Sequence, residues 1–235
     1  MKLIVEKNAM EVSRKLILRI LDIMNEEPSR NYSIALSGGS TPAQLFDLWS
    51  SEYKQETDWD RILFFWVDER CVPPTHSDSN YGMTKKILLD KVPIAEAQVF
   101  RLQGEADPVL EAARYTDLVR DKLQVKNGVP IFDIVLLGAG DDGHTSSIFP
   151  GQEELLTTTA PYAACYNPYN GQKRLALTGQ PLINANLTIF LITGQNKSTV
   201  VLDMYKSGDT GPAAYVAHHA KQVELYIDKA AAIEL

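Results

Sequence analysis

An aspartate and a histidine two residues apart are the side chains of this sequence best suited to move a proton. Asp142 and His144 lie in a glycine-rich loop that directly follows the apolar stretch 131–137. Such a stretch predicts a buried strand, and ligands bind at the carboxyl ends of strands in open α/β sheets. Because imidazole titrates close to neutral pH, His144 is the candidate proton-transfer group.

A second glycine loop, Ser37-Gly38-Gly39-Ser40-Thr41, joins a predicted strand to a predicted helix with Pro42 near its first turn. Paired glycines before a helix direct backbone N–H groups at one point, where the helix dipole favours an anion. The alternative is an ordinary strand-to-helix turn in which Ser40 or Thr41 caps the helix. The spacing is compatible with both interpretations.

Three cations lie near predicted strand ends. Arg70 ends Asp68-Glu69-Arg70, which is predicted to be a loop after a buried strand, Arg174 opens a strand, and Lys197 lies in a strand–glycine–helix segment. Each could be solvated surface charge, but a guanidinium is also a planar fork for phosphate or carboxylate. Together they predict a site for a phosphorylated ligand at the sheet edge that carries the glycine loops. Cys71, beside Arg70, is interpreted as a structural thiol.

The loop at 138–144 also fits the pattern G-x-G-x-x-G of dinucleotide-binding proteins. That site requires a long helix directly after the glycines and an acidic residue farther on. Here Pro150-Gly151 interrupts the helix, and the acidic residues that follow come too early. A metal site built on Asp142 and His144 lacks further ligands, since the other histidines are scattered. We therefore expect neither a metal nor an organic cofactor.

The elements that must position these loops alternate between strands and helices. Strands are predicted at residues 3–6, 32–36, 61–67, 99–102, 131–137, 162–166, 174–178, 187–193 and 223–227, and helices at 8–24, 43–53, 81–89, 107–125 and 196–205. This alternation predicts an α/β fold: a mainly parallel open sheet with helices on both faces, in a Rossmann-like three-layer architecture. No repeat or linker interrupts the pattern, so one domain over residues 1–235 is expected.

Composition and charge narrow the function classes. The net charge of -7 and the absence of a Lys/Arg run argue against nucleic-acid binding. Two cysteines are too few for a disulfide framework and indicate a reducing compartment. The N-terminus does not resemble a signal peptide, and no apolar run is long enough to span a bilayer. We expect a cytoplasmic protein without a membrane partner, as a monomer or a small homo-oligomer.

Six motifs occur in an order that resembles the 6-phosphogluconolactonases, within the larger group of glucosamine-6-phosphate deaminase-like folds. They are S-G-G-S-T-P at 37–42, W-V-D-E-R at 66–70, D-S-N-Y at 78–81, G-A-G-D-D-G-H-T-S-S-I-F-P-G at 138–151, T-G-Q-N-K at 193–197 and D-K-A-A-A at 228–232. The match covers nearly the whole chain. Ser198, where the family more often has alanine, and Gly179-Gln180 depart from its pattern without touching the expected chemistry.

The resemblance implies hydrolysis of 6-phospho-D-glucono-1,5-lactone to 6-phosphogluconate in the oxidative pentose phosphate pathway. By the same resemblance, His144 is the general base with Asp142 beside it. The implied substrate site consists of the 37–41 loop together with Asp68, Arg70, Asn80, Arg174 and Lys197. No metal or cofactor is implied.

This reaction suits the residues. A lactone carbonyl is already electrophilic, so a water activated by one base suffices without a covalent nucleophile. Asp142 could orient the imidazole and stabilise its protonated form, as in the catalytic triad. Donors to the oxyanion are expected among the N–H groups of residues 138–140 or from a nearby cation.

Two alternative functions are compatible with the same fold. Amino-sugar phosphate deaminase/isomerases resemble this chain but carry a glutamate shortly after the histidine, and residues 145–149 contain no carboxylate. A sugar-phosphate-binding regulatory domain without catalysis would be expected to have lost the histidine or to carry a DNA-binding segment. The intact pair Asp142 and His144 favours the lactonase over both.

Overall fold

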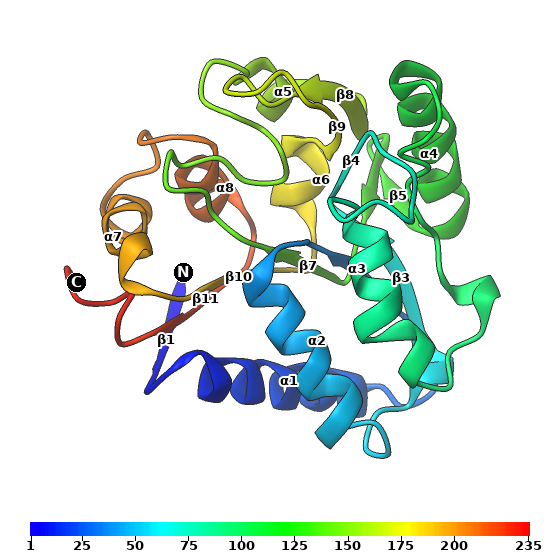
Figure 1. Ribbon diagram of the computed structural model, residues 1–235, viewed down its shortest axis with the longest axis horizontal. Helices are drawn as coiled ribbons and strands as arrows, with labels where there is room; N and C mark the ends of the chain where they lie inside the picture. Colours follow the sequence, from blue (N-terminus) through cyan, green and yellow to red (C-terminus); the bar gives the residue numbers. More distant parts are fainter.

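Six parallel strands form the central sheet of the protein, in the order β1-β11-β10-β7-β2-β3. The computed structural model describes all residues, 1–235 (Figure 1). In that order the strands are β1 (Lys2–Glu6), β11 (Val223–Asp228), β10 (Leu187–Ile192), β7 (Ile134–Leu137), β2 (Tyr32–Leu36) and β3 (Ile62–Trp66). The predicted mainly parallel α/β sheet is confirmed.

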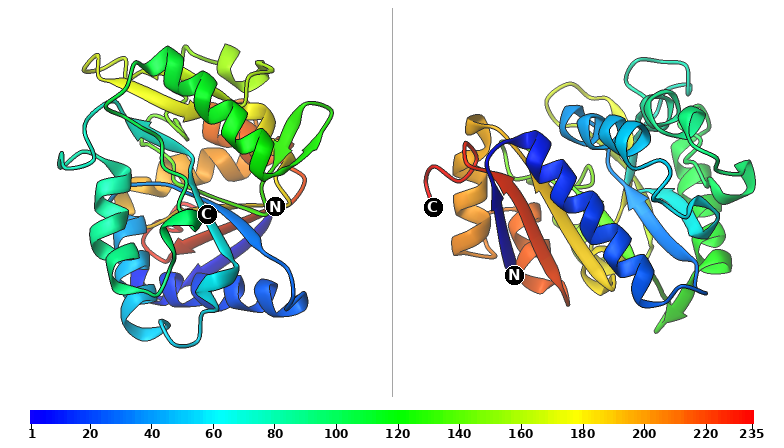
Figure 2. Two further views of the ribbon diagram at one scale, coloured as in Figure 1. Left: turned by 90° about the vertical axis from the view of Figure 1, so that its right-hand side faces the viewer. Right: turned by 90° about the horizontal axis from the view of Figure 1, so that it is seen from below.

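Helices cover both faces of this sheet (Figures 1 and 2). One face carries α1 (Ala9–Glu26), α2 (Ser40–Glu52) and α3 (Asn80–Ile87). The other carries α6 (Gly179–Asn184), α7 (Ser198–Lys206) and α8 (Pro212–His219). None of the helices combines the length and the apolar character that a membrane crossing needs.

A second, antiparallel sheet has the order β4-β9-β8 and lies beyond the carboxyl ends of the parallel strands (Figure 1). It consists of β4 (Asp68–Arg70), β9 (Lys173–Leu177) and β8 (Tyr162–Tyr166). The prediction that residues 68–70 form a loop was wrong. A run of three charged residues has no apolar period, and its partner strand lies far along the chain, so the sequence pattern could not reveal the pairing.

Other differences from the predicted elements are local. The helix α4 (Pro108–Lys122) ends before the predicted residue 125, because β5 (Gln124–Lys126) and β6 (Val129–Ile131) form a hairpin there. Its turn is Asn127-Gly128, with both φ angles positive, as hairpin turns of two residues require. Residues 99–102 form no strand; Val99 makes one isolated bridge to Phe64. The remaining helices are α5 (Glu154–Thr157) and the short η1 (Trp59–Arg61), η2 (Leu89–Lys91), η3 (Glu96–Gln98) and η4 (Gln195–Lys197). The predictions did not include α5, α6 or α8.

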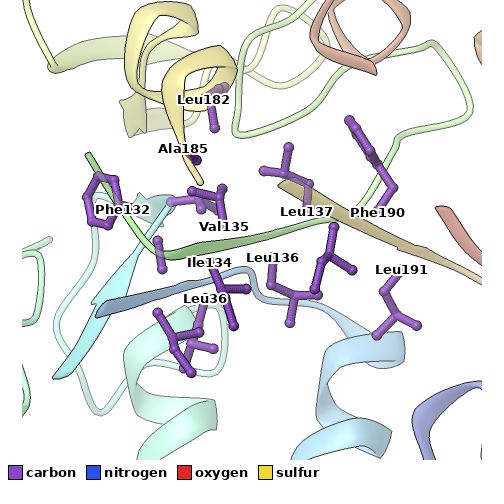
Figure 3. Packing of buried hydrophobic residues seen from close by; sticks show 14 of the residues in the cluster. Leu36, Phe132, Ile134, Val135, Leu136, Leu137, Leu182, Ala185, Phe190 and Leu191 are labelled. Atoms are coloured by element: carbon purple, nitrogen blue, oxygen red, sulfur yellow. The ribbon is translucent and has the colours of Figure 1, made fainter. Parts of the chain in front are cut away.

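The central strand β7 is buried on both faces, which fixes the starting point of the glycine-rich loop. Val135 and Leu137 point toward Leu182 and Ala185 near α6, whereas Ile134 and Leu136 point to the opposite face (Figure 3). All four β7 side chains are at most 2% exposed. Burying one aliphatic side chain of this size contributes roughly 1.5–3 kcal/mol. The carboxyl end of β7 is therefore held firmly, and Gly138 follows it directly.

Candidate active site

A hollow of about 200 Å³ lies where the carboxyl ends of β2 and β7 meet the antiparallel sheet. Most of the predicted site residues line it, although they come from separate parts of the chain. Its walls consist of Ser37, Gly38, Asp68, Arg70, Asn80, Gly138, Ala139, Gly140, His144, Thr145, Ser146, Ser147, Arg174 and Lys197. The structure thus brings together residues from five of the six sequence motifs.

His144 and Asp142 are in direct contact. The imidazole Nδ1 lies 2.6 Å from the Asp142 Oδ1, and the backbone N–H of His144 donates to the same oxygen at 3.2 Å. Because an ionised carboxylate can only accept a hydrogen bond, the neutral ring carries its proton on Nδ1. Nε2 then keeps a lone pair. No protein group hydrogen-bonds Nε2, and His144 lines the hollow while Asp142 lies behind it.

The carboxylate of Asp142 is stabilised in its charged form. Burial by itself would raise the pKa of Asp142, but a hydrogen bond from the Tyr169 hydroxyl and the contacts with His144 outweigh this and lower it. The Tyr169 hydroxyl donates to Oδ2 at 2.7 Å. Asp142 is consequently ionised at neutral pH and holds the imidazole through the Oδ1 that faces it.

A backbone hydrogen bond between Gly140 and His144 closes the loop that carries the imidazole. The Gly140 N–H donates to the His144 carbonyl at 2.9 Å, so it is not available to an oxyanion as the 138–140 prediction allowed. A Cβ on Gly140 would lie 2.1 Å from the His144 Nδ1, so a glycine is required there. The imidazole packs on Phe149, with ring centroids 4.4 Å apart.

Ser146 and Ser147 follow with left-handed backbone conformations, at φ 49° and 54°. Each such non-glycine residue costs about 1–3 kcal/mol and persists only where its surroundings hold it. The Ser146 hydroxyl lies 2.9 Å from the carbonyls of Val67 and Leu177, and the Ser147 hydroxyl donates to the carboxylate of Asp68. These hydroxyls are engaged in holding the loop, which argues against a serine nucleophile.

Two guanidinium groups without a counter-ion form the wall opposite the glycine loops. Arg70 and Arg174 are directly opposite each other on β4 and β9, and neither makes a salt bridge. The Nε atoms of both are buried without a hydrogen-bond partner. Burial lowers the pKa of Arg174, with Asp68 opposing the effect and Arg70 adding to it. Like charges directly opposite on a sheet are destabilising, so this pair is suited to bind an anion.

The two arginines belong to a different sheet from the one predicted. They were expected at the edge of the sheet that carries the glycine loops, but they extend from the antiparallel sheet. Lys197 is in η4, after β10, as that prediction required. Its Nζ donates to the Ala139 carbonyl at 2.9 Å and lies 2.6 Å from the Asp141 Oδ1, so its charge is already compensated.

Glu69 is a buried carboxylate whose role the sequence did not reveal. It is 1% exposed and accepts hydrogen bonds from the N–H groups of Arg70, Asn80 and Tyr81 and from the Ser79 hydroxyl. Burial raises the pKa of Glu69, and these hydrogen bonds work against that rise. The carboxylate thereby holds the first turn of α3 against β4, since a helix N-terminus favours a negative charge.

Asn80 is fixed by this arrangement at the base of the hollow. Its Nδ2 donates to the carbonyl and to Oδ1 of Asp68, at 2.9 and 3.0 Å. Gly38 allows this, because a Cβ on Gly38 would lie 1.8 Å from the Asn80 Oδ1. Asp68, Asn80 and Gly38 therefore form one packed unit.

Only the first two residues of the 37–41 loop line the hollow. Ser37 and Gly38 line it, whereas Gly39, Ser40 and Thr41 do not. The N-cap of α2 is Gly39, at φ 108° and without a side-chain cap, rather than Ser40 or Thr41. The Gly38 and Gly39 N–H groups donate to no acceptor in the protein, and Thr41 Oγ1 lies 3.2 Å from Thr193 Oγ1.

Comparisons with known proteins show which family the chain belongs to. The family model for glucosamine-6-phosphate isomerases/6-phosphogluconolactonase matches residues 6–226. The chain belongs to this family. The 6-phosphogluconolactonase of Treponema pallidum is 43% identical over 187 residues, which are 80% of this chain and 76% of that relative.

Solved structures of family members share the fold. The 6-phosphogluconolactonase from Trypanosoma brucei is 28% identical, with a TM-score of 0.90 over 100% of this chain and 98% of that one. A monomeric glucosamine-6-phosphate deaminase, 21% identical, reaches a TM-score of 0.84 over 100% of both chains, which shows a common fold. The resemblance inferred from the six motifs is confirmed. No three His, Cys, Asp or Glu side chains are grouped as metal ligands.

The close packing of Gly38 on Asn80 predicts a stability difference between two glycine variants. Gly38→Ala should destabilise the fold by about 1–3 kcal/mol, because the new methyl group overlaps Asn80 and disrupts its bonds to Asp68. Gly138→Ala is the matched control: its Cβ meets nothing within 4 Å, and its free energy of unfolding should stay within about 1 kcal/mol of wild type. Urea denaturation followed by circular dichroism measures both; equal values would contradict the packing described.

Proposed function

We propose that this protein hydrolyses 6-phospho-D-glucono-1,5-lactone to 6-phospho-D-gluconate, with His144 as the general base. The observation that carries the proposal is the imidazole of His144, which lines the hollow together with two arginines that make no salt bridge; its Nδ1 contacts Asp142 and its Nε2 has no partner in the protein. The 6-phosphogluconolactonase names of the relatives support the choice of substrate.

In the proposed reaction a water molecule bound at Nε2 attacks C1 of the lactone and gives its proton to the imidazole. The tetrahedral oxyanion then collapses, the bond from C1 to the ring oxygen breaks, and Nε2 returns the proton to that oxygen. Asp142 stabilises the transient imidazolium. A positioned base of this kind typically contributes about 10²–10⁴-fold.

The oxyanion requires donors within the hollow. The N–H groups of Gly138 and Ala139 donate to no acceptor in the protein, whereas the N–H of Gly140 is engaged. Gly138 and Ala139 lie on the same wall as His144. We assign the oxyanion to these two N–H groups, since fixed backbone donors need no rearrangement as charge develops.

The arginine pair is assigned to the phosphate. A phosphate ester carries close to two negative charges at neutral pH, and Arg70 with Arg174 supplies two positive charges that are not engaged in salt bridges. Lys197 already has Asp141 as its partner, so Lys197 is assigned to the sugar ring, together with Ser37, Gly38 and Asn80, which also line the hollow. Binding the phosphate far from C1 holds the lactone in register with the base.

We also propose a cytoplasmic location. Both cysteines are free, which fits a reducing compartment. Burial raises the pKa of Cys71 to about 11 and that of Cys165 to about 12, so neither thiol is a nucleophile at neutral pH.

A direct assay separates this function from that of the related deaminases. Acid release from freshly generated 6-phosphogluconolactone, followed by base consumption at constant pH, should be much faster with the protein than without it. Glucosamine 6-phosphate should yield no ammonia, because the segment after His144 lacks a carboxylate and the only acid lining the hollow, Asp68, is bonded to Asn80 and Ser147. Ammonia release without lactone hydrolysis would overturn the proposal.

His144→Asn tests the assigned base. We expect kcat for the lactone to fall by about 10²–10⁴-fold, the usual contribution of a general base, while 6-phosphogluconate binding measured by calorimetry is retained. His219→Asn is the matched control, since His219 is an exposed residue of α8 that stacks on Tyr215. Wild-type kcat in His144→Asn would remove this imidazole from the mechanism.

Arg174→Ala tests the phosphate site. Loss of a charge-assisted contact worth about 1.5–3 kcal/mol should raise KM for the lactone by roughly 10- to 100-fold with a smaller effect on kcat. Arg120→Ala, at an exposed position of α4, serves as the control. An unchanged KM in Arg174→Ala would mean that the phosphate is bound elsewhere.

A further inference from the structure

The Asp142 carboxylate has a second partner besides His144. The hydroxyl of Tyr169 donates to Oδ2 at 2.7 Å, while Oδ1 accepts from the imidazole at 2.6 Å. The three side chains form a continuous hydrogen-bonded series from the molecular surface to the hollow. Tyr169 also lies edge-on to Phe149, with centroids 6.1 Å apart, and Phe149 packs on the imidazole.

Tyr169 is held in place although its side chain is exposed. It lies at the tip of the β8–β9 hairpin, where the Asn167 N–H donates to the Gln172 carbonyl and the Gly171 N–H to the Asn167 carbonyl. The Tyr169 N–H donates to the Asn167 side chain at 2.8 Å, and Gly171 has φ 71°. The hairpin therefore has a defined conformation and presents the hydroxyl to Asp142.

The other end of the hairpin loop contacts the segment that precedes α3. The Gln172 side chain donates to the Asp78 carboxylate at 3.0 Å, and the Asp78 carbonyl accepts from Arg70. One hairpin thus contacts both the segment that holds the base and the segment that holds a candidate phosphate ligand. The hydroxyl contact belongs to the site rather than to the core, because the Tyr169 side chain is 69% exposed.

We propose that Tyr169 is a positioning residue for His144, acting through Asp142. The inference rests on the proposed role of His144 as the general base. With both carboxylate oxygens engaged, rotation about the Cβ–Cγ bond of Asp142 is restricted, and the imidazole keeps Nε2 directed into the hollow. Tyr169 also sets how strongly Asp142 attracts the proton on Nδ1.

The effect of the Tyr169 hydroxyl on the pKa of Asp142 has a definite direction. Burial raises the pKa of Asp142 and the Tyr169 hydrogen bond lowers it. Removing the hydroxyl leaves a more basic carboxylate beside the imidazole, which favours the imidazolium. Activity should then be lost at a higher pH as the solution is acidified, because a protonated imidazole is not a base.

The other charged groups around the imidazole stay in place when the hydroxyl is removed. They are Asp141 on its own loop, Asp68 and Arg70 on β4, Arg174 on β9 and Lys197 in η4. A shift of the pH profile therefore reports the lost hydroxyl.

The test compares Tyr169→Phe with Tyr166→Phe. Tyr166 lies at the end of β8 in the same hairpin, is 56% exposed, and its hydroxyl makes no hydrogen bond. In Tyr169→Phe we expect kcat to fall about 3- to 10-fold, less than the effect of a buried outer-shell partner because the contact competes with water. KM should be unchanged, and the acid limb of the kcat/KM profile should move to higher pH. Tyr166→Phe should match wild type in all three.

A readout independent of turnover accompanies the kinetics. The Cε1–H NMR resonance of His144, assigned by its absence in His144→Asn, should titrate with a higher midpoint in Tyr169→Phe and an unchanged one in Tyr166→Phe. If wild type lacks lactonase activity, the proposed function fails, and this titration still decides whether Tyr169 acts on the imidazole. An unchanged midpoint, an unchanged kcat, or a higher KM with unchanged kcat would each overturn the inference.

Discussion

The hydrogen bond between the Asp142 carboxylate and the Nδ1 of His144 is the interaction on which the site depends. It determines which nitrogen carries the proton, which nitrogen faces the hollow and how the ring is turned. The neighbouring residues leave room for this hydrogen bond and hold its two side chains in position. Gly140 leaves room for the pair, Phe149 supports one ring face, and β7 fixes the start of the loop because it is buried on both faces.

The positive charges of Arg70 and Arg174, by contrast with the paired Asp142 and His144, have no carboxylate partner. Arg70 and Arg174 are brought together without a salt-bridge partner, and burial works against the charge of Arg174. Glu69, one residue away from Arg70, is directed elsewhere and holds the helix α3. Six of the nine arginines have carboxylate partners, among them Arg14, Arg101 and Arg114, and besides Arg70 and Arg174 only the exposed Arg120 has none. Two half-buried arginines without a carboxylate partner therefore distinguish the hollow from the other arginine positions.

The sequence predicted the parallel sheet and most of the residues that line the hollow, because both depend on local patterns. An apolar strand followed by glycines is recognisable wherever it occurs, and β7 with its loop is such a case. What it could not predict depends on pairing across long stretches of chain. β4 is three charged residues, and only the partner strand β9 makes it a strand. Glu69 and Tyr169 look like ordinary polar residues until folding places them against α3 and Asp142. The Asn127-Gly128 turn, by contrast, was a local hairpin signal that the element predictions overlooked.

The strained pair Ser146 and Ser147 has a wider consequence for the architecture. The Ser146 hydroxyl reaches the carbonyl between β3 and β4 and the one at the end of β9, and Ser147 reaches Asp68. The loop that carries His144 thus follows β7 of the large sheet and is hydrogen-bonded to the small sheet. The small sheet is thus fixed to this loop through two backbone carbonyls, which any sequence would supply, and through the side chain of Asp68, which only an acid at that position of β4 provides.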